Sequence, residues 1–521
     1  MFQHKIKKAL DLLSGLCQTR LMKEEHGTGP NPTHEDLALL AKDELIDIIL
    51  AQNKRIQALE AHLSEFKTIC ERLSDRVVEL EAQLAKNSSN SSKPPSMDGF
   101  KKPKPKSLRK KSGKKPGGQF GHQGKTLKMV ERPDEVVVHP LDLCSCGCGE
   151  SLENEPVLNY ERRQVFELPK PKLTAIEHQV EVKRCPHSGK MVAADFPGDV
   201  NAPTQYGPGL TAFLVYLHNQ QLLPLKRISQ ICFDLFGHEV SEATIVSATK
   251  RMDESLQGFE QSIEDALEKA AVLHADETGL RAKGNLNWLH VLSNEYLTWY
   301  GVHAKRGYIA LEHFDILPHF TNRLIHDCWS SYFQFNCSHG LCNAHILREL
   351  KFCREELKQK WAKRMECLLL DTHRLVEYEK QAGVSGLSPL RQKRIEREYN
   401  AILSQGYLEQ PSSSFAPPKR GRRKKSKAEN LLNRLDKYQD LVLAFSTDFR
   451  VPFTNNQAEQ DVRMMKVQQK ISGGFRTFEG AQGFALIRSY ISTVRKNGVD
   501  ILPAITDALC GRAFLPVIVP E

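Results

Sequence analysis

A seven-residue repeat of apolar side chains, from about Leu45 to Leu84, constrains this chain more than any other feature of its sequence. Two positions of the repeat stay apolar: Ile49, Ile56, Leu63, Cys70, Val77 and Leu84 share the first, and Leu59, Phe66, Leu73 and Leu80 share the second, three residues later. Such a pattern places both sets on one seam of a helix. We therefore predict a coiled coil that makes the protein a homodimer or higher oligomer. One long amphipathic helix packed on its own chain is the alternative.

The repeat stops at residues 86–99, KNSSNSSKPPSMDG, whose composition leaves too little apolar surface to pack a core. Nine of the fifteen residues from Lys101 to Lys115 are Lys or Arg, with no acid among them. The glycine-rich GGQFGHQGK follows at 117–125, and a second basic run, KRGRRKKSK, occupies 419–427. Two such runs in a chain of formal net charge +10 favour a phosphate backbone as partner. We expect 85–130 to be a flexible basic linker.

The length of 521 residues predicts several domains, because one hydrophobic core rarely supports so long a chain. No apolar run reaches the 18 or so residues that a membrane span needs, and Asp11 interrupts the apolar stretch at the start. The sequence therefore predicts a cytoplasmic, nucleoid-associated protein with no membrane partner. With no export signal, the thirteen cysteines are expected as thiols with one possible metal site.

Residues 131–200 and 201–255 differ in texture. DEVVVHP and AIEHQVEVKRC alternate like short strands around a cysteine cluster, which predicts a small β module. After Tyr206 the pattern becomes helical, with Gly237 between two helices and Ser241 as the N-cap of the second. This arrangement is typical of a helix-turn-helix that binds DNA, although any two packed helices can produce it.

From Ala271 onwards the sequence predicts strands in AVLHADETGL, NLNWLHVLSN, LTWYGVHA and NRLIHDCW, with a helical spacer before the fourth. These elements predict a mixed α/β layer. Residues 345–445 are helical and charged, and helices resume at Asn455.

Three acids in this region are candidate metal ligands. Asp276 follows AVLHA and Asp327 follows RLIH, so each stands where a buried strand ends, although an Asp there is often a turn residue. Glu459 falls in a predicted helix, TNNQAEQDVRMMKVQQKISGG, that begins near an Asn and ends at Gly473 and Gly474. The basic residues on the same face of this helix as Glu459 are Arg463, Lys466 and Lys470. We expect them to bind the phosphates of DNA. Pairing of the glutamate with an arginine on the helix surface is the alternative.

Six blocks, in order along the chain, resemble the insertion sequence sixty-six family of bacterial transposases. They are NSSNSSKPPSMD, GGQFGHQGK, HADET, CNAHILREL, NNQAEQDVR and KISGGFRT. The resemblance implies a ribonuclease H-like catalytic domain with an Asp-Asp-Glu site made by Asp276, Asp327 and Glu459. Two magnesium or manganese ions would be its cofactors. Arg476 of the last block joins the basic residues expected to bind DNA.

The second acid departs from the family pattern. Members of the family commonly have D-x-Y-x-x-Y there, whereas this chain has DCWSSY, so Asp327 depends on its strand position as much as on the motif. Asp315, in HFDILP, is the competing candidate.

The cysteine cluster resembles the small zinc-finger module of the family. Cys144, Cys148, Cys185 and His187 would supply four zinc ligands, and Cys146 could replace either of the first two. A degenerate finger without metal is the alternative. Cys337, His339, Cys342 and His345 form a second possible set, of which the resemblance accounts for only Cys342 and His345.

The expected fold is multidomain α+β, and the expected function is transposition. The protein would bind terminal inverted repeats and target DNA, cleave and transfer strands, and pair ends through the coiled coil, with possible accessory proteins. A DNA-binding or end-bridging regulator with a decayed nuclease fold is the alternative, and a simple nuclease is a weaker one.

The expected domains are a helical region at 1–84 (coiled coil about 45–84), a linker at 85–130, a zinc-finger-like β module at 131–200, a helix-turn-helix-like region at 201–255, a catalytic domain at 256–344 and 446–497, a helical insertion with a basic loop at 345–445, and a tail at 498–521.

Overall fold

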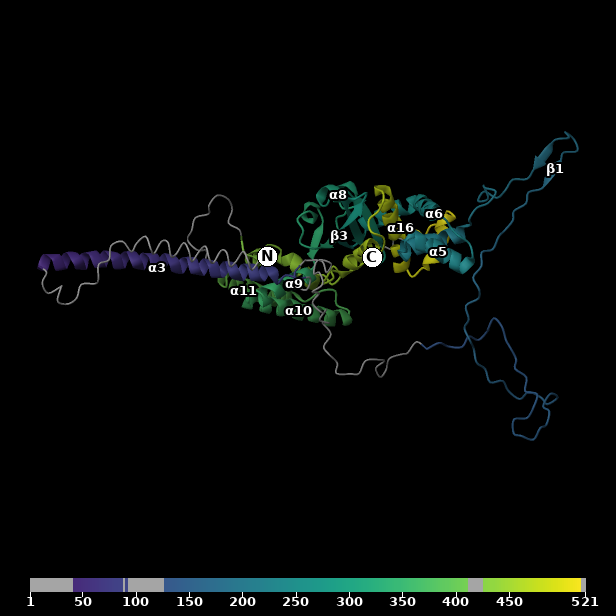
Figure 1. Cartoon of the computed structure of the whole chain (residues 1–521), viewed down its shortest axis with the longest axis horizontal. Coiled ribbons are helices and arrows are strands. Elements are labelled where there is room, and N and C mark those ends of the chain that lie inside the picture. The colour runs from purple at the N-terminus through teal and green to yellow at the C-terminus, as the bar shows by residue number, and fades with distance from the viewer. Residues whose placement is uncertain (1–40, 88–89, 92–125, 411–424, 517–521) are drawn as a thin grey trace. The chain divides into compact units, whose positions relative to one another are not determined.

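The computed structural model describes residues 41–87, 90–91, 126–410 and 425–516 (Figure 1). The chain divides into two units, Met1–Ala85 and Lys86–Glu521, and each is described by itself. Most of the predicted basic linker and most of the second basic run lie outside the described residues. None of the described helices has both the length and the apolar character that crossing a bilayer requires.

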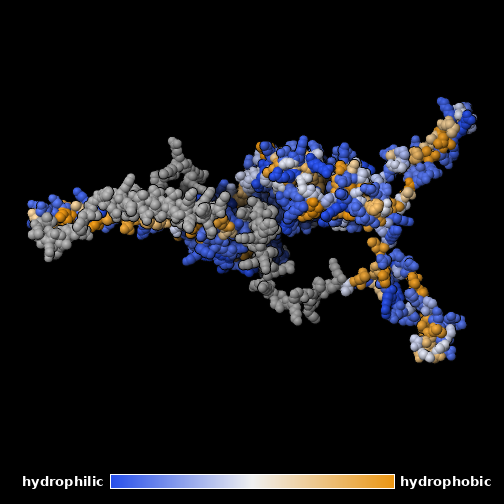
Figure 2. All heavy atoms as spheres, in the orientation of Figure 1, coloured by the Kyte–Doolittle hydropathy of each residue, from blue (hydrophilic) through white to orange (hydrophobic). Residues whose placement is uncertain are grey.

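In the first unit, α3 (Lys42–Leu84) is one continuous helix, as the repeat predicts. Its first turn is fixed by Glu44, whose carboxylate accepts a hydrogen bond of 2.9 Å from the Ala41 N–H. All ten seam side chains are exposed, and Figure 2 shows apolar residues along the helix in orange. An exposed apolar seam of this length favours a partner helix, and the coiled coil stays a prediction.

Residues 131–200 contain less strand than the alternation predicts. The described strands are β1 (Val182–Arg184) and β2 (Met191–Ala193), which pair as an antiparallel hairpin, and one isolated bridge joins Leu143 to Ser151. DEVVVHP forms no strand, because Val136, Val137 and their neighbours remain exposed. Alternation produces a stable strand only where one face is buried, and the described part of this segment buries almost nothing.

The helical region that follows is formed as predicted. It comprises α4 (Pro208–Val215), a π-helical turn η2 (Tyr216–Gln220), α5 (Leu225–Phe236), α6 (Glu242–Ser255) and α7 (Gln257–Glu268). Gly237 ends α5 with φ 66°, and the Ser241 hydroxyl accepts a hydrogen bond from the Thr244 N–H at the start of α6. The buried faces of these helices belong to the same hydrophobic core as the sheet described below, so 201–255 does not have a core of its own.

A five-stranded mixed sheet lies at the centre of this unit, in the order β5-β4-β3-β6-β7. β3 is the middle strand and pairs antiparallel with β4 on one side and parallel with β6 on the other. All four predicted strands are confirmed, whereas the short last strand was not predicted, because SHGL is too short to show a period. The strands are β3 (Val272–Ala282), β4 (Asn285–Ser293), β5 (Thr298–His303), β6 (Arg323–His326) and β7 (Ser338–Leu341), with α8 (Tyr308–His313) before β6 and the short η3 (Tyr332–Gln334) after it.

One edge of the sheet is covered by α16 (Phe478–Lys496). The Ser489 hydroxyl accepts a hydrogen bond of 2.8 Å from the Tyr300 N–H, and the Thr493 hydroxyl accepts one of 3.1 Å from the Thr298 N–H. Two hydroxyls one helical turn apart therefore satisfy donors that the edge strand β5 would otherwise leave unpaired.

The remaining helices are mostly those predicted. The insertion comprises α9 (Asn343–Glu355), α10 (Lys360–Gln381), α11 (Pro389–Leu408), α12 (Lys427–Lys437), α13 (Gln439–Val442) and α14 (Ala444–Thr447), and α15 (Asn456–Ser472) follows it. The segment 498–521, expected as a tail, instead contains α17 (Ile501–Leu509), whose Ala504, Ile505 and Ala508 are buried in the core. An apolar face at helical spacing explains why this segment packs.

Candidate active site

The register of the sheet brings the first two predicted acids to the same level. β3 and β6 run parallel, with Leu273 opposite Leu324 and His274 opposite Ile325. Extending this register by two residues places Asp276 opposite Asp327, which directly follows β6. Adjacent strands lie about 4.8 Å apart, so the two carboxylates emerge side by side.

The third acid comes from α15, and Asn455 fixes where that helix begins. The Asn455 side-chain amide donates a hydrogen bond of 2.7 Å to the Ala275 carbonyl, and its oxygen lies 2.7 Å from Nδ1 of the buried His274. Asn455 precedes α15 without capping it, because its side chain is held by β3 instead. Glu459 therefore lies one turn into a helix that is tied to the strand that carries Asp276.

The electrostatics confirm that negative charges gather here. Burial raises the pKa of Asp276 well above its usual value, and the charges of Glu277, Asp327 and Glu459 raise it further. Burial, followed by the charge of Glu277, raises the pKa of Asp327 to about 6, although Arg306 opposes the shift. Asp327 Oδ1 and Glu459 Oε1 are buried oxygens without a hydrogen-bond partner. Such oxygens fit a cation, because buried acceptors are otherwise satisfied.

The competing second acid lies elsewhere. Asp315 has φ 57° and an exposed carboxylate whose ion-pair partner is His319, 3.3 Å away. The acids whose charges raise the pKa of Asp276 are instead Glu277, Asp327 and Glu459.

Sequence reasoning missed Glu277, which carries much of the charge at this site. Its side chain is only 2% exposed, and it accepts hydrogen bonds from Arg306 Nε at 3.1 Å and from the Tyr332 hydroxyl at 2.5 Å. The Arg306 guanidinium in turn lies between two indole rings, 4.7 Å from the centroid of Trp288 and 4.2 Å from that of Trp329. HADET contains Glu277, but its partners come from distant segments that no spacing reveals.

The four predicted DNA-binding residues have different environments. Arg463, Lys470 and Arg476 are exposed and can reach a phosphate. Lys466 is half-buried, and its ammonium donates a hydrogen bond of 2.9 Å to the Gly279 carbonyl of β3. Burial lowers the pKa of Lys466, so this residue supports the packing of α15 on the sheet.

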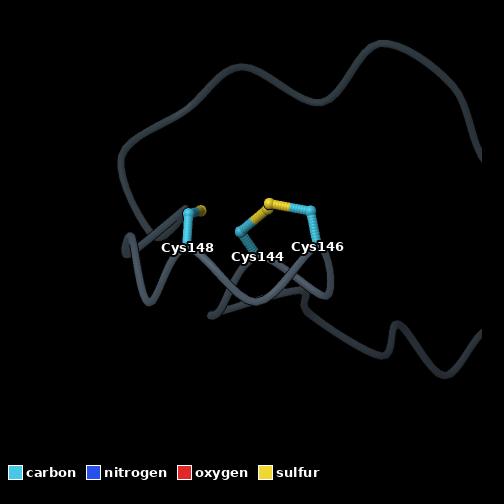
Figure 3. A group of neighbouring side chains, drawn as sticks. All are labelled: Cys144, Cys146 and Cys148. Atoms are coloured by element: carbon cyan, nitrogen blue, oxygen red, sulfur yellow. The ribbon is translucent and has the colours of Figure 1, made fainter.

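Three of the predicted thiols come together. Cys144, Cys146 and Cys148 have sulfur atoms within 4.8 Å of one another, and those of Cys144 and Cys146 point toward each other at 2.9 Å (Figure 3). Cys185 and His187 are not part of this group, so the described structure does not assemble the predicted quartet. Hydrogen bonds from Ser188 lower the pKa of the Cys185 thiol, which favours the thiolate that binds metals.

The second possible cysteine and histidine set is divided. His339 Nδ1 lies 3.1 Å from Nε2 of the buried His326, whereas Cys342 and His345 lie with Glu459. Of the four residues in this set, the structure therefore brings only Cys342 and His345 together as possible metal ligands.

Together, the buried acids on neighbouring strands and a helix define a candidate metal-ion-dependent enzyme site. The family model described as Transposase IS66 family matches residues 203–483, and this chain belongs to that family. Membership indicates a role in DNA transposition and a DNA substrate. A second model, described as a family of unknown function (DUF6444), matches residues 43–128, and no curated protein matches the chain.

Proposed function

We propose that this protein is an Asp-Asp-Glu transposase, in which Asp276, Asp327 and Glu459 form the catalytic site of a ribonuclease H-like domain. The observation that carries the proposal is the convergence of these acids: two lie level on adjacent parallel strands, and the third lies on a helix tied to the same strand. The mixed sheet, with three antiparallel strands followed by two parallel ones, supports this fold.

The three carboxylates would hold two magnesium or manganese ions. Oxygen donors suit these ions, and the unsatisfied Asp327 Oδ1 and Glu459 Oε1 supply them. When bound, such ions stabilise the attacking and leaving oxygens of a phosphodiester exchange. Asn455 positions the helix that carries Glu459, and the pairing of Glu277 with Arg306 keeps a fourth acid out of the ligand set.

The exposed basic residues Arg463, Lys470 and Arg476 would hold DNA phosphates beside the acids. Terminal inverted repeats would be bound by the N-terminal half, with α5 and α6 as the helix-turn-helix, and the coiled coil on α3 would pair two ends. Water would attack the phosphodiester at the element end and break its bond to the 3′ oxygen, which leaves as a 3′ hydroxyl. This hydroxyl would then attack a target phosphodiester, forming a new P–O bond and releasing the 3′ hydroxyl of the cut target strand.

The cysteine segment would bind zinc through Cys144, Cys148, Cys185 and His187, and Cys146 could replace either of the first two. Two thiolates on one tetrahedral zinc stand about 3.8 Å apart. If Cys144 and Cys146 both bind the ion, the 2.9 Å contact between their sulfur atoms must therefore lengthen. The loop that carries Cys185 and His187 would then move towards the loop that carries the cysteine cluster.

The test is magnesium-dependent nicking and strand transfer on a labelled element end, measured beside DNA binding on the same preparations. Asp276→Asn and Glu459→Gln keep shape but remove a negative ligand, so the rates should fall by roughly a thousandfold or more while end binding survives. Asp315→Asn is the matched control, because its exposed carboxylate lies outside the site.

Two results would change this assignment. A Glu459→Gln protein that transfers strands at the parental rate would remove Glu459 from the site. A parental protein that binds ends but cuts with no divalent ion would favour the regulator. Changing Arg463 and Lys470 to Ala should instead weaken DNA binding and flatten its salt dependence.

A further inference from the structure

A second group of metal-binding atoms lies beside the proposed catalytic site and has a different chemistry. A sulfur, an imidazole nitrogen and a carboxylate oxygen, from Cys342, His345 and Glu459, all lie within 4.8 Å of one another. Cys342 and His345 stand at the start of α9, and Glu459 stands in the first turn of α15. We propose that these three residues bind one borderline-soft divalent ion, best represented by Zn²⁺, which joins the helical insertion to α15.

The spacing of two of these atoms fits ligands on an ion better than a direct contact. His345 Nδ1 and Glu459 Oε1 are both buried and have no hydrogen-bond partner. They lie 3.7 Å apart, which is too far for a hydrogen bond. Two ligand atoms on a tetrahedral zinc ion, each about 2.1 Å from it, stand about 3.4 Å apart. A small adjustment would therefore satisfy both orphaned atoms at once.

The third ligand selects the kind of metal. Cys342 is buried, and its sulfur accepts a hydrogen bond of 3.2 Å from the Asn455 N–H. This hydrogen bond orients the sulfur and favours the thiolate, although burial, followed by the charge of Glu459, raises the pKa of the Cys342 thiol overall. A bound cation would supply the charge that holds the thiolate there. Thiolate and imidazole suit zinc, whereas magnesium takes oxygen ligands. The group therefore differs in selectivity from the three acids, although it shares Glu459 with them.

A cavity beside two of the three ligands has room for a water molecule. A cavity of about 150 Å³ is lined by Cys342 and His345, together with Asp327, Glu349 and Arg434. The second oxygen of Glu459 faces Arg348 at 3.6 Å, so Oε1 is the oxygen that this ion would take. The same oxygen would serve the magnesium ions of the proposed catalytic site, so the two kinds of ion would compete for it. Three protein ligands and one water complete a tetrahedral site.

The experiment uses the full-length protein with Cys144, Cys146 and Cys148 all changed to Ser, which removes the other thiol cluster. Co²⁺ serves as the probe, because a cobalt–thiolate bond gives a charge-transfer absorption band that oxygen ligands do not give. We expect about one Co²⁺ per chain with this band, and its displacement by Zn²⁺ but not by Mg²⁺. Adding Cys342→Ser or His345→Gln should abolish the band or weaken cobalt binding at least tenfold.

The matched control is Cys353→Ser, which changes another buried cysteine of α9 outside the group and should retain the band. Circular dichroism and the melting temperature establish whether each variant folds. If Cys342→Ser does not fold, His345→Gln provides the second test. No band, or a band that survives both substitutions, would overturn the proposal. Because the readout needs no DNA, a failure of the proposed transposase activity leaves it unaffected.

Discussion

The acidic site on the sheet and the cysteine cluster at 144–148 both gather metal-binding side chains, but the chain supports them in opposite ways. Beside the acids, Leu273 and Leu324 are completely buried. In the cysteine segment, Leu158 is 95% exposed and Val165 is 87% exposed. The first site is therefore positioned by a hydrophobic core, whereas the second has little buried apolar surface around it, and we propose that a bound metal ion orders it. The difference teaches that ligand spacing locates a site reliably only where packing fixes the backbone.

The largest expected effect concerns zinc in the cysteine segment. Structural zinc contributes on the order of 10 kcal/mol to the folding of small domains, and no core replaces it here. Cys185→Ser should therefore lower the zinc content by about one ion per chain, measured by elemental analysis. It should also expose 131–200 to proteolysis while the melting temperature of the core stays unchanged. Cys510→Ser, at an exposed thiol outside the segment 131–200, is the control. Equal zinc content in the two variants would leave the finger unsupported.

The second prediction compares the two regions with the same substitution. Leu273→Ala should destabilise the protein by about 2–5 kcal/mol, because it leaves a cavity beneath the acids. Leu158→Ala should cost less than about 0.5 kcal/mol, because the side chain is already in water. Denaturant unfolding of the two variants measures the difference. Similar losses would mean that Leu158 is buried in the folded protein and that the contrast is wrong.

The same contrast explains what the sequence could predict. The strand that contains Asp276 and the strand that ends just before Asp327 could be predicted because their apolar residues pack in a core, and burial is what makes periodicity informative. The strand expected in DEVVVHP failed because alternation there has nothing to cover. The caps at Ser241 and Gly237 were found because they act on neighbouring residues.

Other features needed contacts between distant segments. Asn455 is recognisable as the start of a helix, but its bonds to His274 and Ala275 join residues about 180 positions apart. The hydrogen bond from the Lys466 ammonium to a carbonyl of β3 could not be predicted for the same reason, and its role in DNA binding stays a prediction. A sequence pattern gives the face of a helix and not the strand against which that face packs.

The third prediction concerns α3, where apolar residues are exposed as in the cysteine segment but repeat every heptad. Leu63→Glu with Phe66→Glu should weaken self-association of the full-length protein about 10- to 100-fold, because the charges enter the predicted seam. Thr68→Glu, on the outward face, should leave it unchanged. Sedimentation over a concentration series measures the effect. A parental protein that remains monomeric would remove the coiled coil.

The smallest expected effect concerns Glu264, a partly buried acid on α7 whose negative charge lowers the stability of the folded protein. Burial, with the charge of Glu260, raises the pKa of Glu264 to about 7 from its usual value of 4.5, although Trp299 Nε1 donates a hydrogen bond of 3.2 Å to it. Below pH 4.5 the carboxyl is protonated in the folded and the unfolded chain, so it costs nothing. As the pH rises to about 7 the unfolded chain ionises first, and stability is lost.

Because Glu264 is partly exposed, solvent screening reduces this loss to about 1 kcal/mol. Glu264→Gln keeps an acceptor for Trp299 and removes the charge, so its melting temperature should exceed that of the parent at pH 8 and match it at pH 4. The control is Glu239→Gln, an exposed acid in the loop between α5 and α6, where water already solvates the charge. Thermal unfolding at both pH values measures the effect. If Glu264→Gln and Glu239→Gln change the pH dependence of the melting temperature equally, the loss of stability does not come from burial of the carboxylate. The electrostatic difference between buried and exposed regions would then be wrong.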